Sequence, residues 1–166
     1  MSEPRVEVRM EVRGLMLDPS TNVPIVILRD EAGTRLLPIW IGLFEANAIA
    51  LNIEGVQPPR PLTHDLLQVL LEKLGGQLLR VLISDLRATT YYALLFVKTG
   101  TGEVEVDSRP SDAIALALRA KAPIFVASDV LDRARAIHVG TEQLDEDRLK
   151  KYLEELGPDD LGKYTM

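Results

Sequence analysis

The sequence predicts a single α+β domain in which helices pack on a mostly antiparallel or mixed β-sheet. Residues 5–13 alternate charged and apolar side chains, the period of a strand with one buried face. Residues 66–74 instead repeat leucine at the spacing of an amphipathic helix. The 166 residues are 46% hydrophobic and 27% charged. A chain of this length and composition fits one hydrophobic core.

The N-terminal half contains three stretches with strand character and one helix. The expected strands are residues 5–13, 23–28 and 35–41. A polar loop follows the first strand, and residues 30–33 form the turn of a hairpin between the other two. Gly42 ends this hairpin, and residues 45–53 place small and apolar side chains on one helical face. A helix therefore follows a strand directly.

Proline-rich residues 57–61 form a stiff connection to the second half. Thr63 is the expected N-cap of a second helix, with Asp65 in its first turn and two glycines, residues 75–76, at its end. The strands expected after this helix are residues 78–86, 91–97, 103–106 and 124–126. The helices expected there begin at Pro110 and cover residues 129–136 and 149–156.

We assign residues 1–140 to the main domain and residues 141–166 to a C-terminal helix and tail. The apolar side chains of the C-terminal segment recur at i, i+3, i+4 and i+7, which predicts an amphipathic helix that docks or pairs. The main domain also contains a weak echo, because the letters Ala-Ile-Ala-Leu occur in two helices that each follow a strand, at residues 48–51 and 113–116. This echo suggests pseudo-symmetry.

Composition restricts the possible functions. The absence of cysteine excludes disulfides and thiolate chemistry, and no apolar stretch approaches the ~20 residues that span a bilayer. We therefore expect a cytoplasmic protein with no membrane association. The formal charge of −6 gives no general attraction to phosphate backbones, so a nucleic-acid role requires a local basic patch or a bound cation. Glycine-rich phosphate loops and hydrolase signatures are absent, and we expect no organic cofactor.

The polar run of residues 107–112, Asp-Ser-Arg-Pro-Ser-Asp, is the strongest candidate site. Because the residue before a proline avoids helical angles, Arg109 is the expected N-cap, with Pro110 as the first helical residue. Arginine cannot accept the free N–H groups there, so its guanidinium serves either an ion pair with Asp107 or Asp112 or an anionic ligand. Asp107 and Asp112 could also hold a divalent cation through oxygen ligands.

Three further residues lie near expected helix starts. Glu45 is either an acid that stabilises the helix dipole or a second carboxylate of the site. His64 either faces solvent beside a cap or, as a neutral imidazole, accepts a proton or binds a metal. Asp65 follows it in the first turn of the same helix.

Five segments together closely resemble the bifunctional nuclease (BFN) domain family: residues 37–42, 45–46, 48–51, 59–66 and 106–117. The resemblance covers about residues 6–136. It implies an α+β domain that forms a homodimer or higher homo-oligomer, with a plant relative credited with DNase and RNase activity. The motif residues carry over without departures to Glu45, His64, Asp65, Asp107, Arg109 and Asp112.

The leading hypothesis is a nuclease that hydrolyses phosphodiester bonds of DNA or RNA. In it Mg²⁺ or Mn²⁺ is bound by carboxylates among Glu45, Asp65, Asp107 and Asp112, with Asp107 and Asp112 as the preferred metal ligands. Arg109 stabilises the transition state, and His64 is a general acid or base. The alternative is a non-catalytic regulatory or binding module whose pocket around Arg109 takes an anion or another small ligand.

Overall fold

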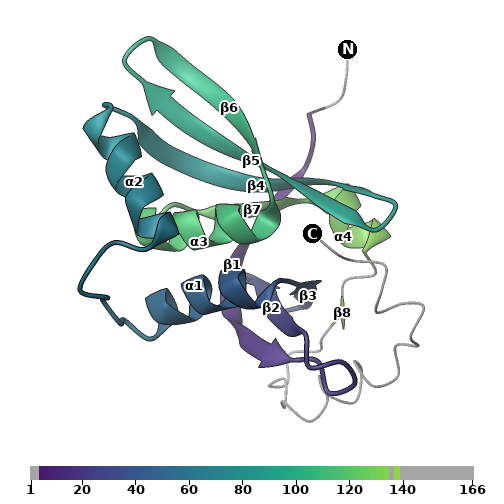
Figure 1. The fold of residues 1–166 in the computed structure, drawn as a ribbon. Helices are drawn as coiled ribbons and strands as arrows, with labels where there is room; N and C mark the ends of the chain where they lie inside the picture. The colour runs from purple at the N-terminus through teal and green to yellow at the C-terminus, as the bar shows by residue number, and fades with distance from the viewer. Residues whose placement is uncertain (1–3, 135–136, 139–166) are drawn as a thin grey trace.

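A computed structural model describes residues 4–134 and 137–138 and confirms the α+β architecture (Figure 1). The strands are β1 (Glu7–Leu17), β2 (Pro24–Asp30), β3 (Arg35–Trp40), β4 (Gln77–Arg87), β5 (Thr90–Thr99), β6 (Gly102–Ser108), β7 (Ile124–Ala127) and β8 (Ile137–His138). The helices are α1 (Leu43–Ile53), α2 (Thr63–Lys73), α3 (Pro110–Ala120) and α4 (Ser128–Arg133). Within these described ranges, no helix is long and apolar enough to cross a membrane.

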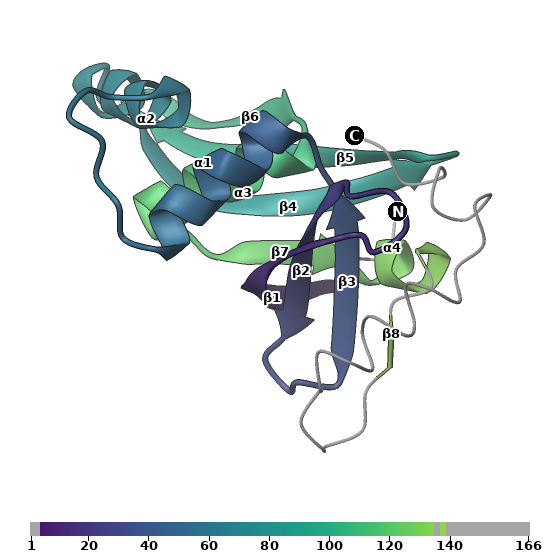
Figure 2. The same cartoon turned by 60° about the horizontal axis from the view of Figure 1, so that its bottom comes forward.

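The described strands form one mixed sheet with the order β6-β5-β4-β7-β1-β2-β3-β8. Every neighbouring pair is antiparallel except β4 and β7, which run parallel. Figure 2 shows that the half containing β1, β2 and β3 is turned strongly relative to the half containing β4, β5 and β6. The expectation of a mostly antiparallel or mixed sheet is therefore confirmed.

The two halves of the sheet share one plan. In each half, three consecutive strands pair as an antiparallel meander, and a helix follows the third strand directly. The first unit is β1-β2-β3-α1 and the second is β4-β5-β6-α3. Strand β7 joins them, since Ile124 pairs with Val81 of β4 and Val126 pairs with Val8 of β1. This repeated plan agrees with the weak internal echo of the sequence.

Helix α3 is the central helix of the fold. Seven of its eleven residues are buried, four of them small: Ser111, Ala113, Ala115 and Ala117. Small side chains let α1 and α2 approach α3 closely, and both helices contact it. Ile49 of α1 and Ile114 of α3 are fully buried, and burial of such a side chain contributes about 1.5–3 kcal/mol. The packing of three helices thus fixes how their N-terminal turns meet.

Helix α2 forms as expected, but its apolar stripe is largely uncovered within the described part of the chain. None of its residues is buried, and its exposed large apolar residues are Leu66, Leu67, Val69 and Leu70. The helix packs mainly against α3 and β4, and its Leu71 is partly buried against the core. Leucine periodicity therefore predicted the helix correctly without predicting how much of it is covered.

Some element boundaries differ from the sequence-based expectation. The first helix begins at Leu43, two residues earlier than expected, and α4 covers Ser128–Arg133 instead of residues 129–136. The proposed C-terminal helix at residues 149–156 and the domain boundary at residue 140 lie outside the described residues.

Candidate functional site

Arg109 is the N-cap of α3, as the following proline predicted. Its backbone is extended, with φ −73° and ψ 147°, and Pro110 is the first helical residue. The side chain makes no capping hydrogen bond. The guanidinium is therefore directed to other partners, and 51% of the Arg109 side chain is exposed to solvent.

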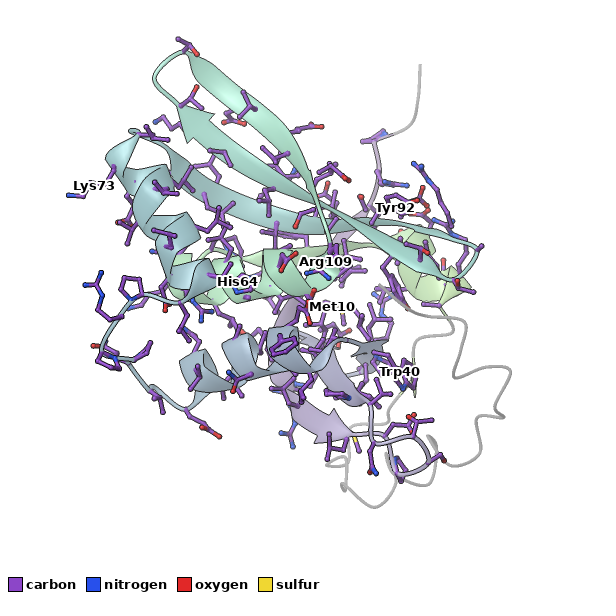
Figure 3. All side chains as sticks on the ribbon, viewed as in Figure 1. Met10, Trp40, His64, Lys73, Tyr92 and Arg109 are labelled. Atoms are coloured by element: carbon purple, nitrogen blue, oxygen red, sulfur yellow. The ribbon has the colours of Figure 1, made fainter. Side chains whose placement is uncertain are left out.

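A chain of hydrogen bonds joins α1, α2 and α3 around Arg109. Its Nε donates to Oδ2 of Asp112 at 2.9 Å, and its Nη2 donates to Oε1 of Glu45 at 2.9 Å. The other oxygen of Asp112, Oδ1, lies 2.8 Å from Nε2 of His64. Figure 3 shows His64 and Arg109 close together at the start of α3, with Lys73 far away at the opposite end of α2. Four of the six predicted site residues thus form one network.

Gly42 makes room for the carboxylate of Glu45. Gly42 is the N-cap of α1, and a Cβ added there would lie 2.2 Å from Oε2 of Glu45. The Gly42 φ of −72° is accessible to any residue, so the glycine is required for space and not for backbone angles. A side chain at position 42 would therefore displace the Glu45 carboxylate that binds Arg109.

The network shifts the pKa values of Asp112 and Arg109. The hydrogen bond from His64 and the weaker effect of Arg109 lower the pKa of Asp112, against the opposing effect of burial. The hydrogen bond to Asp112, with a further one to Glu45, raises the pKa of Arg109. Asp112 is thus held as a carboxylate and Arg109 as a cation.

Asp112 also determines which nitrogen of neutral His64 carries the proton. A carboxylate can only accept, so Nε2 of His64 must be the protonated nitrogen in their 2.8 Å contact. Nδ1 is then the free acceptor, because it makes no hydrogen bond to another described residue. The imidazole side chain is only 12% exposed. His64 is therefore an oriented proton acceptor with one available nitrogen.

Asp65 belongs to a second, adjacent pair. Its Oδ1 accepts from Nε of Arg119 at 2.7 Å, and its Oδ2 accepts from the backbone N–H of Leu62 at 2.9 Å. The pKa of Asp65 is lowered, first by the Leu62 bond and then by Arg119, against the opposing effect of burial. Leu62, not Thr63, is the N-cap of α2. The expectation for Thr63 was wrong because Asp65, at the third helical position, satisfies the N-cap backbone.

The sequence reasoning missed Arg119. This residue lies seven positions after Asp112 in α3, and side chains two turns apart share one helical face. Arginine near a helix C-terminus is ordinarily a surface residue that complements the dipole, so its type gave no sign of burial. The one available signal was its position on the same face as Asp112, in a helix rich in alanine.

Asp107 stands apart from this network. It lies on the edge strand β6, paired with Leu94, and its exposed side chain makes no hydrogen bond or ion pair with another described residue. Both oxygens of Asp112 are occupied by His64 and Arg109. In the described part of the chain, no three His, Asp or Glu side chains are grouped closely enough to hold a metal ion. This arrangement does not itself form a cage of protein ligands.

The fold and these contacts define an α+β domain with a charged cluster where three helices meet. The Bifunctional nuclease domain family model matches residues 26–138, more than half of the chain. The chain belongs to the bifunctional nuclease domain family.

Relatives fall into two groups. An uncharacterised protein of Mycobacterium tuberculosis is 43% identical over 161 residues, covering 91% of this chain and 96% of the relative. Bifunctional nuclease 2 of Oryza sativa subsp. japonica is 33% identical over 118 residues, 69% of this chain. Bifunctional nuclease 1 of Arabidopsis thaliana is 34% identical over 107 residues, 62% of this chain. These matches cover only 36% and 33% of the two plant proteins.

Proposed function

We propose that this protein is a nuclease that hydrolyses phosphodiester bonds of DNA or RNA. The observation that carries the proposal is the network His64–Asp112–Arg109–Glu45, which combines an oriented imidazole with a half-exposed guanidinium. Membership of the bifunctional nuclease domain family supports the same reaction. The plant relatives named as nucleases support it further.

Arg109 is suited to bind the phosphodiester. A guanidinium has five N–H donors, and the bonds to Asp112 and Glu45 use only Nε and one N–H of Nη2. Nη1 makes no hydrogen bond to another described residue, and the side chain is half exposed. Two phosphate oxygens can therefore be bound in the planar, bidentate manner that arginine favours. The positive charge of Arg109 would then stabilise the negative charge that develops on the phosphate oxygens as water attacks phosphorus.

His64 is suited to move the proton. With Nε2–H fixed on Asp112, Nδ1 can accept a proton from the attacking water and return it to the leaving oxygen. Asp112 then stabilises the imidazolium, which is the role of the carboxylate in other Asp–His pairs. Glu45 orients Arg109 from the opposite side. His64 thus transfers the proton, while Asp112 and Glu45 orient His64 and Arg109.

The charge of the cluster suggests a role for a divalent cation. When His64 is neutral, the two carboxylates and the guanidinium sum to one negative charge, which repels an anionic substrate. Mg²⁺ commonly retains several waters and takes only one or two protein carboxylates together with substrate phosphates. We therefore retain Mg²⁺ or Mn²⁺ as a proposed cofactor, with Asp112 and Asp107 as the candidate ligands. The roles of Arg109 and His64 do not depend on it.

Hydrolysis by the purified full chain tests the proposal. Single- and double-stranded DNA and RNA are incubated with and without EDTA, using the parent and the single variants Asp112→Asn and Asp107→Asn. We expect cleavage by the parent and a strong loss in Asp112→Asn. Loss in Asp107→Asn as well, together with EDTA sensitivity, would support the two-carboxylate metal site. Full activity in the folded Asp112→Asn variant contradicts the proposed site.

A binding module is the second candidate, and one observation favours it. Both oxygens of Asp112 and one oxygen of Glu45 are already bound by internal partners, so the cluster is a closed set of ion pairs with Arg109 facing solvent. Such a site can hold an anion without chemistry. Thermal shift with inorganic phosphate and with mononucleotides separates the candidates, since a ligand at 100 times its Kd stabilises by about 2.7 kcal/mol. Such stabilisation without any cleavage would favour the module.

A further inference from the structure

A buried arginine outside the His64–Asp112–Arg109–Glu45 network connects all three helices that form it. The Arg119 side chain is only 7% exposed. Its Nε donates to Oδ1 of Asp65 in α2, and its Nη1 donates to the carbonyl oxygen of Ala115 in α3. Its Nη2 donates to the carbonyl oxygen of Ala48 in α1 at 3.1 Å. One planar group therefore bonds simultaneously to α1, α2 and α3.

The partners of Arg119 lie beside the residues of the network. Asp65 directly follows His64, and Ala48 lies one helical turn after Glu45. The second oxygen of Asp65 accepts the N–H of Leu62, so this carboxylate also fixes the first turn of α2. A movement of Asp65 would move His64 relative to Asp112. The hydrogen bond from Arg119 to Asp65 therefore helps to maintain the 2.8 Å contact between His64 and Asp112.

Resting on the function proposed above, we propose that Arg119, acting through Asp65, is the positioning residue that holds His64 against Asp112. Asp65 in this arrangement is part of the support and not a group that exchanges protons with substrate, because both of its oxygens are occupied. The chemistry of arginine matters here: its rigid, planar set of donors serves three acceptors at once, which the single ammonium of lysine cannot do in the same geometry.

The first test measures the carboxyl titration of Asp112 by NMR in EDTA, with neither metal nor substrate present, so that only the contacts of the protein act on this carboxyl group. The hydrogen bond from His64 is the largest cause of the lowered Asp112 pKa. We expect Arg119→Lys to raise the pKa of Asp112, in the direction and up to the size of the rise in His64→Ala. In a His64→Ala background, Arg119→Lys should produce no further rise, because the effect passes through His64.

Arg133 provides the matched control for the Arg→Lys substitution. It also makes several hydrogen bonds, to the carbonyl oxygens of Leu86 and Asp129 and to the carboxylate of Asp85, but it lies in α4. Arg133→Lys should leave the titration of Asp112 unchanged. If Arg119→Lys does not fold, Asp65→Asn replaces it, because it weakens the same support from the other side and is expected to give the same rise.

The result that overturns the proposal is a folded Arg119→Lys or Asp65→Asn variant whose Asp112 titration equals that of the parent. An equal rise in the presence and absence of His64 would also overturn it, because the effect would then be a general loosening of the fold. Hydrolysis adds a second readout: kcat should fall by about 10–100-fold with little change in KM, since Arg109 still binds substrate. If the parent cleaves nothing, the nuclease proposal fails while the titration still decides the role of Arg119.

Discussion

The two meander-and-helix units of this protein start their helices in the same way but with different N-caps. In β1-β2-β3-α1 the N-cap is Gly42, and in β4-β5-β6-α3 it is Arg109; both backbones are extended. Each helix carries an acid at its third position, Glu45 in α1 and Asp112 in α3. Both acids accept hydrogen bonds from the single guanidinium of Arg109.

The difference between the N-caps converts two similar helix starts into one site. The absent side chain of Gly42 leaves space for Glu45 to approach Arg109, while the long side chain of Arg109 reaches across the junction. An acid near a helix N-terminus is by itself only a favourable charge. The shared cation joins two such acids, and His64 from α2 extends the network. Substitutions of Arg109, His64 and Gly42 should break this asymmetry, in decreasing order of effect, and a substitution of Asp85 outside the site provides a contrast.

Removal of the Arg109 guanidinium should have the largest effect on the rate of hydrolysis. Arg109→Ala leaves Glu45 and Asp112 without their common partner and removes the group proposed to bind phosphate. We expect hydrolysis to fall by about 10²–10³-fold, the loss typical for a missing transition-state donor. Arg109→Lys should recover only part of the activity, because lysine lacks the planar, bidentate geometry. Parent-like rates in a folded Arg109→Ala variant would show that the asymmetry has no catalytic meaning.

Replacement of His64 tests whether this α2 residue contributes to hydrolysis. His64→Gln retains a polar side chain but cannot carry a proton between water and leaving oxygen. A loss of about 10²-fold in kcat is expected, the lower end for general acid–base catalysis. Single-turnover hydrolysis measures the loss. His138→Gln is the matched control, and an unchanged kcat in folded His64→Gln would exclude the proton-transfer role.

Gly42→Ala tests the space that the first unit provides. The added Cβ meets only the flexible end of Glu45, so stability should change by less than about 1 kcal/mol in urea unfolding. Displacement of the Glu45 carboxylate removes one of the two hydrogen bonds that orient Arg109, so hydrolysis should fall by roughly tenfold. Gly100→Ala is the control, because a Cβ there has no neighbour within 4 Å. If both glycine variants are equally active, Glu45 does not orient Arg109 for the reaction.

The smallest effect concerns an ion-pair cluster between β4 of the second unit and α4, outside the site. The hydrogen bonds of Arg87 and Arg133 lower the pKa of Asp85 from 3.8 to about 2. Because the folded pKa is below the unfolded one, Asp85 stabilises the fold above about pH 4 and loses this contribution as pH falls toward 2. Asp85→Asn should therefore be less stable than the parent at neutral pH, with a difference that shrinks in acid. Urea unfolding at several pH values measures this, and hydrolysis should be unchanged.

Much of the fold was predictable because its signals are local. Alternation predicted β1, apolar runs between turn residues predicted other strands, and Pro110 predicted that Arg109 would be an extended N-cap. The sheet order was not predictable in the same way. Strand β7 pairs in parallel with β4 and antiparallel with β1, and both partners are remote in sequence. A short apolar run such as residues 124–127 contains no information about which strands it will join.

Part of the candidate site was also predictable, because helix starts are local signals. Glu45, His64 and Asp112 each lie near a helix start, which local patterns identify, and the packing of the helices brings the three together. Whether a carboxylate joins the network depends on the direction of its side chain. Asp107, only five residues from Asp112, does not join it. Arg119 was missed because burial of an arginine depends on remote acceptors, such as the carbonyl oxygen of Ala48.

Strand β6 also affects how copies of the protein meet one another. It lies at the edge of the described sheet, and Glu103, Glu105 and Asp107 share one of its faces because side chains alternate along a strand. A second β6 that paired with it in antiparallel register would bring these acids opposite acids, and such pairs repel. We therefore expect this row of acids, Asp107 among them, to oppose self-association of the β6 edge into extended sheets.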